Sequence, residues 1–287
     1  MSEARQHWDR FWRERFPEPA DFCEDPQTWS DVVWKVALED WYSLFERLLS
    51  GKQLLECGCG SAKLSRYMAE RGYRCTMLDY SEEALRLART KFEAQALTGR
   101  FMKGDVNLLP FPDGLFDVVY SGGMLEFFPD IQAPVREMVR VLKPGGLFTA
   151  NMVPNKFSCQ TLADMERTLA HSVKCLCRGR FRDAFAVLHH LPQGVTRASL
   201  RDYVRCCEAA GLTSVAARCV TPFPALALGR RGDRLYARFL RRMLPLWRRF
   251  NEFPARWHET WGIAYRIHGL KPAGESLLLK GVHENRN

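Results

Sequence analysis

Residues 53–72 read QLLECGCGSAKLSRYMAERG, and this stretch decides the fold. The apolar run at 53–57 predicts a short strand, and the segment 61–72 has helical character and ends at a glycine. Between them, Gly58 and Gly60 permit a tight turn and let a ligand approach the backbone closely. The unpaired N–H groups at the start of the following helix would suit a nucleotide-like ligand.

The rhythm of strand and helix continues down the chain. We expect further strands at 74–80, 100–105, 116–121, 147–153, 214–222 and 261–269, with helices that start at Ser81, follow the apolar stripe Val135, Met138, Val139 and Leu142, and span 199–212. Strands that alternate with helices of this length indicate a parallel sheet covered on both faces. The expected fold class is therefore α/β: a Rossmann-like, doubly wound, seven-stranded and mostly parallel sheet with helical insertions.

The segments around this core suggest how the domain is organised. Residues 1–50 are rich in tryptophan and predict an aromatic-rich helical cap, with a helix leading into the first strand. Residues 51–153 form the expected ligand-binding core, and 154–287 the C-terminal part of the same domain. Two helical, basic insertions lie in that part, at 155–196 and 226–258. Ligands of such sheets bind beyond the carboxyl ends of the strands, so we expect the insertions to form a substrate lid.

The bulk composition is that of a globular protein, with 46% hydrophobic and 26% charged residues among 287. No stretch approaches the roughly 20 apolar residues that cross a bilayer, and the N-terminus lacks the apolar core of a secretory signal. None of the ten cysteines forms a Cys-x-x-Cys pair. We therefore expect reduced thiols, no metal site and a cytoplasmic location.

The net charge of +9 is unevenly distributed along the chain. Residues 230–259 contain nine arginines and three acidic residues, interleaved with apolar side chains. We favour a solvated basic face on a helix that packs against its own core. The alternative is a surface that attracts RNA or an anionic membrane.

Sequence motifs at the ends of the expected strands point to one family. The segment 56–62, Glu-Cys-Gly-Cys-Gly-Ser-Ala, fits an acid-x-Gly-x-Gly-x-small pattern, whereas a nicotinamide fingerprint would need a small residue at Lys63. Asp79 follows at the end of the second strand, and Gly-Asp at 104–105 ends the third. FDVVYSGGMLEFFPD (116–130) and VLKPGG (141–146) complete the series. In this order and spacing the motifs resemble those of class I S-adenosylmethionine-dependent methyltransferases, specifically the methyltransferase type 11 group, over about residues 50–153.

The resemblance implies a site for S-adenosyl-L-methionine in the core. The implied cofactor-binding residues are Glu56, Gly58, Cys59 and Gly60 at the methionine part, Asp79 and Tyr80 at the ribose and adenine, Asp105 and Val106 at the adenine edge, and Ser121 and Gly122 near the sulfonium. Three of them have structural alternatives. Asp79 would otherwise cap a helix, Asp105 would hold a turn, and Tyr80 would face solvent.

Two residues are candidates for a catalytic base. Glu126 follows the fourth strand and would accept a proton if burial raised its pKa, or else play a structural role at a helix start. His189 lies in the first insertion and would reach the site from the lid, or else face solvent. Quinone-methylating members of the group often carry a His-His-Phe-like run where this chain has Glu-Phe-Phe, which argues against a quinone acceptor.

The function implied by the resemblance is methyl transfer from S-adenosyl-L-methionine to an O, N or C atom of a small or medium-sized molecule, a biosynthetic intermediate, leaving S-adenosyl-L-homocysteine. The chain lacks an Asn/Asp-Pro-Pro-Tyr motif, which disfavours DNA as a partner. Two alternatives stay open. The basic insertion would serve an RNA, protein or lipid-linked substrate, or the protein would bind the cofactor without turnover.

Overall fold

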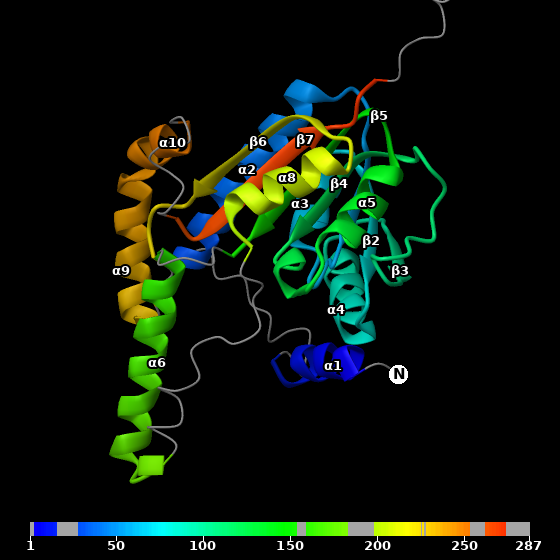
Figure 1. The fold of residues 1–287 in the computed structure, drawn as a ribbon. Coiled ribbons are helices and arrows are strands. Elements are labelled where there is room, and N and C mark those ends of the chain that lie inside the picture. Colours follow the sequence, from blue (N-terminus) through cyan, green and yellow to red (C-terminus); the bar gives the residue numbers. More distant parts are fainter. Residues whose placement is uncertain are drawn as a thin grey trace, which may run out of the picture.

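The computed structural model describes residues 3–15, 28–153, 159–182, 198–224, 226, 228–252 and 262–273. In chain order its elements are α1 (Glu3–Arg15), α2 (Trp29–Leu48), β1 (Gln53–Cys57), α3 (Lys63–Ala69), β2 (Arg74–Asp79), α4 (Glu82–Glu93), β3 (Arg100–Lys103), β4 (Phe116–Gly122), the short 3-10 helix η2 (Leu125–Phe127), α5 (Gln132–Arg140), β5 (Leu142–Met152), α6 (Cys159–Cys177), α8 (Leu200–Ala209), β6 (Thr213–Val220), α9 (Gly229–Arg242), α10 (Leu244–Glu252) and β7 (Ala264–Leu270). Figure 1 shows how these elements surround a single sheet.

The sheet has seven strands in the order β3-β2-β1-β4-β5-β7-β6. The first five strands pair in parallel, whereas β7 runs antiparallel to both β5 and β6. This arrangement confirms the expected doubly wound, mostly parallel sheet. The strand order reverses between β1 and β4, where Cys57 of β1 lies level with Leu78 of β2 and Ser121 of β4. Ligands bind at such a switch point, beyond the carboxyl ends of the strands.

Alternating side chains of the central strands feed two cores, one on each face of the sheet. Leu54 of β1 and Val118 of β4 pack with α2, α3 and α4, whereas Leu55 and Val119 pack with α5 and α8. Both faces are therefore buried. This explains why these strands read as continuous apolar runs rather than as alternating ones.

The fifth strand starts earlier than the sequence predicts. The sequence places Leu142 in a helical stripe and a strand at 147–153, but β5 already begins at Leu142 and includes the Pro-Gly-Gly run at 144–146. The N–H of Gly145 donates to the carbonyl of Lys271, and the N–H of Lys271 donates to the carbonyl of Gly146, each at 2.9 Å. The segment after β7 thus pairs with this run, in which Gly145 has a φ of +78°.

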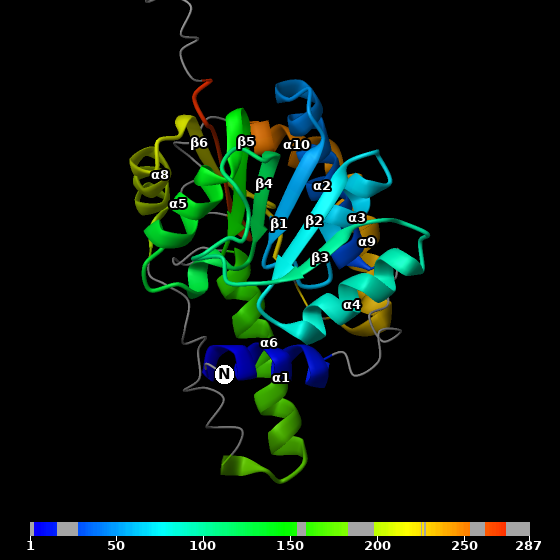
Figure 2. The same ribbon diagram turned by 90° about the vertical axis from the view of Figure 1, so that its right-hand side faces the viewer.

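The N-terminal segment contains two helices rather than the single one that its apolar spacing predicts. α2 packs on the sheet, with Trp41 and Phe45 almost fully buried beneath it. α1 lies apart from α2, below the carboxyl edge of the sheet in both ribbon views (Figures 1 and 2).

The two insertions supply the helices α6, α9 and α10. The apolar side of α9 packs on α2, where Ala237 and Leu240 meet Val32 and Val36, and Arg231 and other arginines of α9 are exposed. α6 extends below the sheet, as Figures 1 and 2 show. None of the helices within the described residues is both long enough and apolar enough to span a membrane.

Candidate functional site

The turn after β1 has a backbone that only glycine adopts without strain. Gly58 and Gly60 have φ angles of +65° and +50°. A Cβ at Gly58 would lie 2.7 Å from the sulfur of Met124, and one at Gly60 would lie 2.8 Å from the ring of Trp12. The side chains of Met124 and Trp12 therefore occupy the space that a side chain at either glycine would need, and both would have to move for a ligand to approach this backbone.

Glu56 holds the start of the helix that follows this turn. Ala62, the N-cap of α3, has a φ of 53° and no capping side chain. The carboxylate of Glu56 takes over this role, because its Oε2 accepts a hydrogen bond from the N–H of Ser65 at 3.0 Å. Burial raises the pKa of Glu56 to about 7. Glu56 is thus buried and supports the start of α3.

Asp79 ends β2 and locks the glycine turn to the next strand. Its two carboxylate oxygens accept hydrogen bonds from the N–H of Gly60 and the N–H of Ser81, both at 2.9 Å. The residue is 8% exposed, and burial raises the pKa of its carboxyl group. A third backbone hydrogen bond, from Tyr80, also lowers this pKa, and the carboxylate has about four lone-pair sites in all, so it keeps some acceptor capacity for a ligand hydroxyl. Asp79 does not cap α4, the alternative role that the sequence allowed. The cap is Ser81, whose side chain accepts a hydrogen bond from the N–H of Ala84.

The residues expected at the adenine edge lie after β2 and β3. Tyr80 is half-buried and Val106 is buried. Asp105 is exposed, and its Oδ1 accepts hydrogen bonds from the backbone N–H and the side-chain amide of Asn107, both at 2.9 Å. Asp105 therefore holds its own turn, as the structural alternative proposed, while the remaining lone pairs of its carboxylate keep acceptor capacity.

The end of β4 carries buried polar groups whose hydrogen-bonding capacity is not filled. Within the described part of the chain, neither the hydroxyl of Ser121 nor the Oε2 of Glu126 has a hydrogen-bond partner. The other oxygen of Glu126 accepts from the N–H of Val153 at 3.3 Å, and burial raises the pKa of this carboxyl to about 7. Buried polar atoms without partners are rare and costly, and these two adjoin the carboxyl edge, so they are candidates to bind a ligand group. Gly122 adjoins them on the same strand.

The remaining candidates do not add chemistry to this site. His189 lies outside the described residues. The thiol of Cys59 is buried in the glycine turn, and burial raises its pKa well above the ordinary value, which makes it a poor nucleophile. The nine cysteines of the described residues are free, and no group of three or more His, Cys, Asp or Glu side chains among those residues could hold a metal ion.

Comparison with protein-family models places this turn in a family. A model described as a methyltransferase domain matches residues 55–150. Residues 55–150 are a methyltransferase domain. The match runs from the middle of β1 to the middle of β5, and so contains the glycine turn, Asp79, Asp105 and Glu126.

Curated relatives match over the same part of the chain. Over 108 residues the chain is 36% identical to the malonyl-[acyl-carrier protein] O-methyltransferase of Serratia marcescens, which covers 36% of this chain and 41% of that protein. Over 105 residues it is 42% identical to the demethylmenaquinone methyltransferase of Listeria welshimeri, covering 35% and 44%. The alignments thus span about two fifths of the length of these relatives.

Solved structures resemble the chain over nearly its whole length. One comes from work on the conversion of a disulfide bond into a thioacetal group during echinomycin biosynthesis, with 20% identity, a TM-score of 0.54 and 96% coverage of both chains. Another belongs to a complex that contains the Haloferax volcanii Trm112 methyltransferase activator, with 21% identity, a TM-score of 0.52, and coverage of 93% and 95%. At this identity the likeness shows the fold.

Two residues that lie beside the methyltransferase motifs were not predicted to belong to the site. Met124 and Trp12 lie against the two glycines, and Trp12 belongs to α1, outside the matched region. The only sequence signal for Trp12 is its spacing from Trp8, four residues apart on one side of a helix. Nothing in that spacing tells which surface the helix covers.

Proposed function

We propose that this protein transfers a methyl group from S-adenosyl-L-methionine to a small molecule. The observation that carries the proposal is the pairing of a side-chain-free glycine turn with a buried carboxylate, Asp79, at the switch point of a methyltransferase domain. When bound, S-adenosyl-L-methionine supplies an electrophilic methyl group on a cationic sulfur, and S-adenosyl-L-homocysteine is released after transfer.

The residues of the edge fit an adenosyl group. Asp79 would accept hydrogen bonds from the ribose hydroxyls, in part by exchanging the backbone hydrogen bonds that its carboxylate now accepts. Tyr80, Asp105 and Val106 would lie at the adenine, beside the ends of β2 and β3. The methionine part would lie along the backbone at Gly58 and Gly60 and extend toward Ser121 and Gly122 at the end of β4.

Glu126 is the residue that we propose for the acceptor side. Its unpartnered Oε2 would accept a hydrogen bond from a hydroxyl or amine of the acceptor, and then its proton as the new bond to carbon forms. A carboxyl with a pKa near 7 is matched to this role at neutral pH. Proximity carries much of the rate, because orienting two bound reactants can contribute about 7–11 kcal/mol.

The relatives support a small acceptor rather than a polymer. Two of them are named for malonyl-[acyl-carrier protein] and for demethylmenaquinone, each a biosynthetic intermediate. We propose an acceptor of this size class and retain Glu126 as the argument against a quinone. Ala237 and Leu240 of α9 are buried against α2, which supports a helix packed on its own core over an RNA-binding or membrane-binding one, although Leu235 and Phe239 of the same helix are exposed.

Equilibrium binding tests the proposal. Calorimetric titration of the full chain should show S-adenosyl-L-methionine and S-adenosyl-L-homocysteine binding at one site, with NAD⁺ and ATP as nucleotide controls that do not bind. Binding of NAD⁺ together with silence toward both adenosyl compounds would refute the assignment. A tritiated methyl group appearing on a hydroxyl- or amine-bearing acceptor would then exclude the alternative of a protein without turnover.

A further inference from the structure

The helix α1 crosses the carboxyl edge of the sheet directly below the candidate cofactor site. Figures 1 and 2 show it at that edge from two perpendicular directions. Its side chains reach the segments that follow three different strands. Trp12 touches the glycine turn after β1, Asp9 and Arg13 bind the segment after β2, and Trp8 meets the segment after β4.

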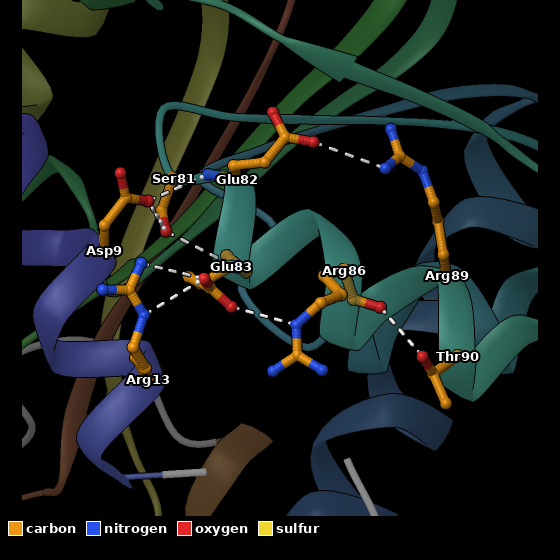
Figure 3. Close-up of polar contacts among 9 residues, drawn as sticks. Asp9, Arg13, Ser81, Glu82, Glu83, Arg86, Arg89 and Thr90 are labelled. Atoms are coloured by element: carbon orange, nitrogen blue, oxygen red, sulfur yellow. Dashed lines mark hydrogen bonds and ion pairs between the residues drawn. The ribbon is translucent and has the colours of Figure 1, made fainter. Parts of the chain in front are cut away.

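Polar contacts attach α1 to the first turn of α4, as Figure 3 shows. The Oδ1 of Asp9 accepts hydrogen bonds from the hydroxyl of Ser81 at 2.6 Å and from the N–H of Glu82 at 3.0 Å. The guanidinium of Arg13 donates to Glu83 at 3.0 and 3.2 Å. Asp9 thus places a negative charge at the N-terminus of α4, where the helix dipole favours it.

Two tryptophans of α1 also make aromatic contacts with the edge of the sheet. The ring of Trp12 lies so near Gly60 that a Cβ there would be 2.8 Å from it. Trp8 meets Phe127 edge to face, with ring centroids 5.0 Å apart. Phe127 adjoins Glu126, the proposed acceptor-side residue. One helix therefore covers both the cofactor end and the acceptor end of the site.

Within the described part of the chain, the attachment of α1 consists of contacts made by a few of its side chains, and no backbone–backbone hydrogen bond joins α1 to the other elements. The side chain of Arg13 is 65% exposed, so water screens its ion pair with Glu83. Exposed ion pairs contribute little to stability, and helix α1 carries such a pair together with a partly exposed tryptophan. A cover held in this way would lift far more often than the strands beneath it would separate.

We propose that α1 is a lid over the cofactor site, with Asp9 and Arg13 as its latch and Trp12 as its seal. The cofactor enters, and the product leaves, only when α1 lifts from Gly60 and Ser81. Once the ring of Trp12 has moved away from Gly60, α1 would close over the bound ligand and keep water from its methyl group. This inference rests on the proposed function, because it takes the ligand to be the adenosyl compound.

A lid of this kind has a kinetic signature that a simple contact lacks. The observed association rate is the intrinsic rate multiplied by the open fraction, and dissociation also waits for opening. A weaker latch therefore raises both rate constants. A residue that merely touches the ligand would change mainly the dissociation rate.

Stopped-flow binding of S-adenosyl-L-homocysteine tests the lid. Arg13→Ala removes the bond from α1 to Glu83, and Arg86→Ala is its matched control, because Arg86 binds the same carboxylate from within α4 at 2.9 Å. Arg13→Ala should raise both rate constants about twofold to fivefold, the effect of one exposed ion pair. Trp12→Ala should raise both by about tenfold, since an aromatic contact is lost. Arg86→Ala should leave both at the wild-type values.

Each outcome decides between the lid and its alternatives. Unchanged rates in Arg13→Ala and Trp12→Ala overturn the lid, as does a faster dissociation with unchanged association. Equal effects of Arg13→Ala and Arg86→Ala also overturn it, since Glu83 and not α1 would then matter. A wild-type chain that does not bind the product refutes the proposed function instead, so the two failures are distinguishable. Thermal unfolding of each variant confirms that the sheet stays folded.

Discussion

The change Asp79→Asn separates the role of this carboxylate in binding from its role in the fold. The introduced asparagine would retain one carbonyl oxygen, which accepts from Gly60 or from Ser81, but its amide group would face the other N–H. Both N–H groups now donate to Asp79 at 2.9 Å. One buried donor is left without a partner, which costs about 1–3 kcal/mol of unfolding free energy.

The loss in binding follows from the charge of the acceptor. Hydrogen bonds to a charged group contribute about 1.5–3 kcal/mol, against about 0.5–1.5 kcal/mol for neutral pairs. Two ribose hydroxyls bound to Asp79 would together lose about 2 kcal/mol, which corresponds to about thirtyfold in Kd. Calorimetric titration with S-adenosyl-L-homocysteine measures this change in Kd. The titration is run at a temperature at which urea unfolding shows that the wild type and Asp79→Asn are both folded.

Asp117→Asn is the matched control. Asp117 lies near the start of β4, at the opposite edge of the sheet, and accepts from the N–H of Gln53 and from Lys143, both at 2.8 Å. Its amide variant should lose stability by a similar mechanism and bind the product with wild-type affinity. Wild-type affinity in Asp79→Asn, or equal weakening in Asp117→Asn, would show that the carboxylate at the end of β2 does not hold the ribose.

Three further changes test the site. Because the base must be deprotonated, wild-type turnover should rise with pH and level off above about 7; Glu126→Gln should lower kcat by about 10²–10⁴ and abolish this inflection, with product affinity unchanged. Burial raises the pKa of Glu56 from 4.5 to about 7, so the folded state favours the protonated form and wild-type stability falls as pH rises through this interval. Glu56→Gln keeps an acceptor for Ser65, so between pH 5 and pH 8 its free energy of unfolding in urea should rise by up to about 3 kcal/mol relative to that of the wild type. A difference in unfolding free energy that stays constant with pH would contradict the raised pKa of Glu56. Gly58→Ala combines a φ of +65° with a clash at Met124 and should cost about 1–3 kcal/mol in the same unfolding assay, with weaker product binding; a neutral change would mean that the turn tolerates a side chain.

The core of the fold could be predicted because its local sequence patterns agree with the way its side chains pack. Strands buried on both faces read as apolar runs, and glycines at +65° and +50° stand where the turn needs them. The predicted start of β5 was wrong because Lys271, which pairs with this segment, is far away in the sequence. Long-range pairing of this kind leaves no trace in a local window.

The candidate site was predictable only where one residue type suits one task. Asp79 followed from a carboxylate at a strand end, and its hydrogen bonds to Gly60 and Ser81 agree with that placement. Glu56 stays a predicted ligand contact, and its hydrogen bond from Ser65, which holds the start of α3, was not predicted from the sequence. The position of Trp12 depends on how α1 docks, which amphipathic spacing does not encode.

The central claim is that the edge formed by the glycine turn and Asp79 binds an adenosyl group. A crystal structure of the full chain grown with S-adenosyl-L-homocysteine tests it most directly. We predict density for the ligand between α1 and the turn, with both ribose hydroxyls on Asp79 and the sulfur near Ser121. Ligand bound elsewhere, or saturating ligand with this edge still filled by Trp12 and Met124, would contradict the account.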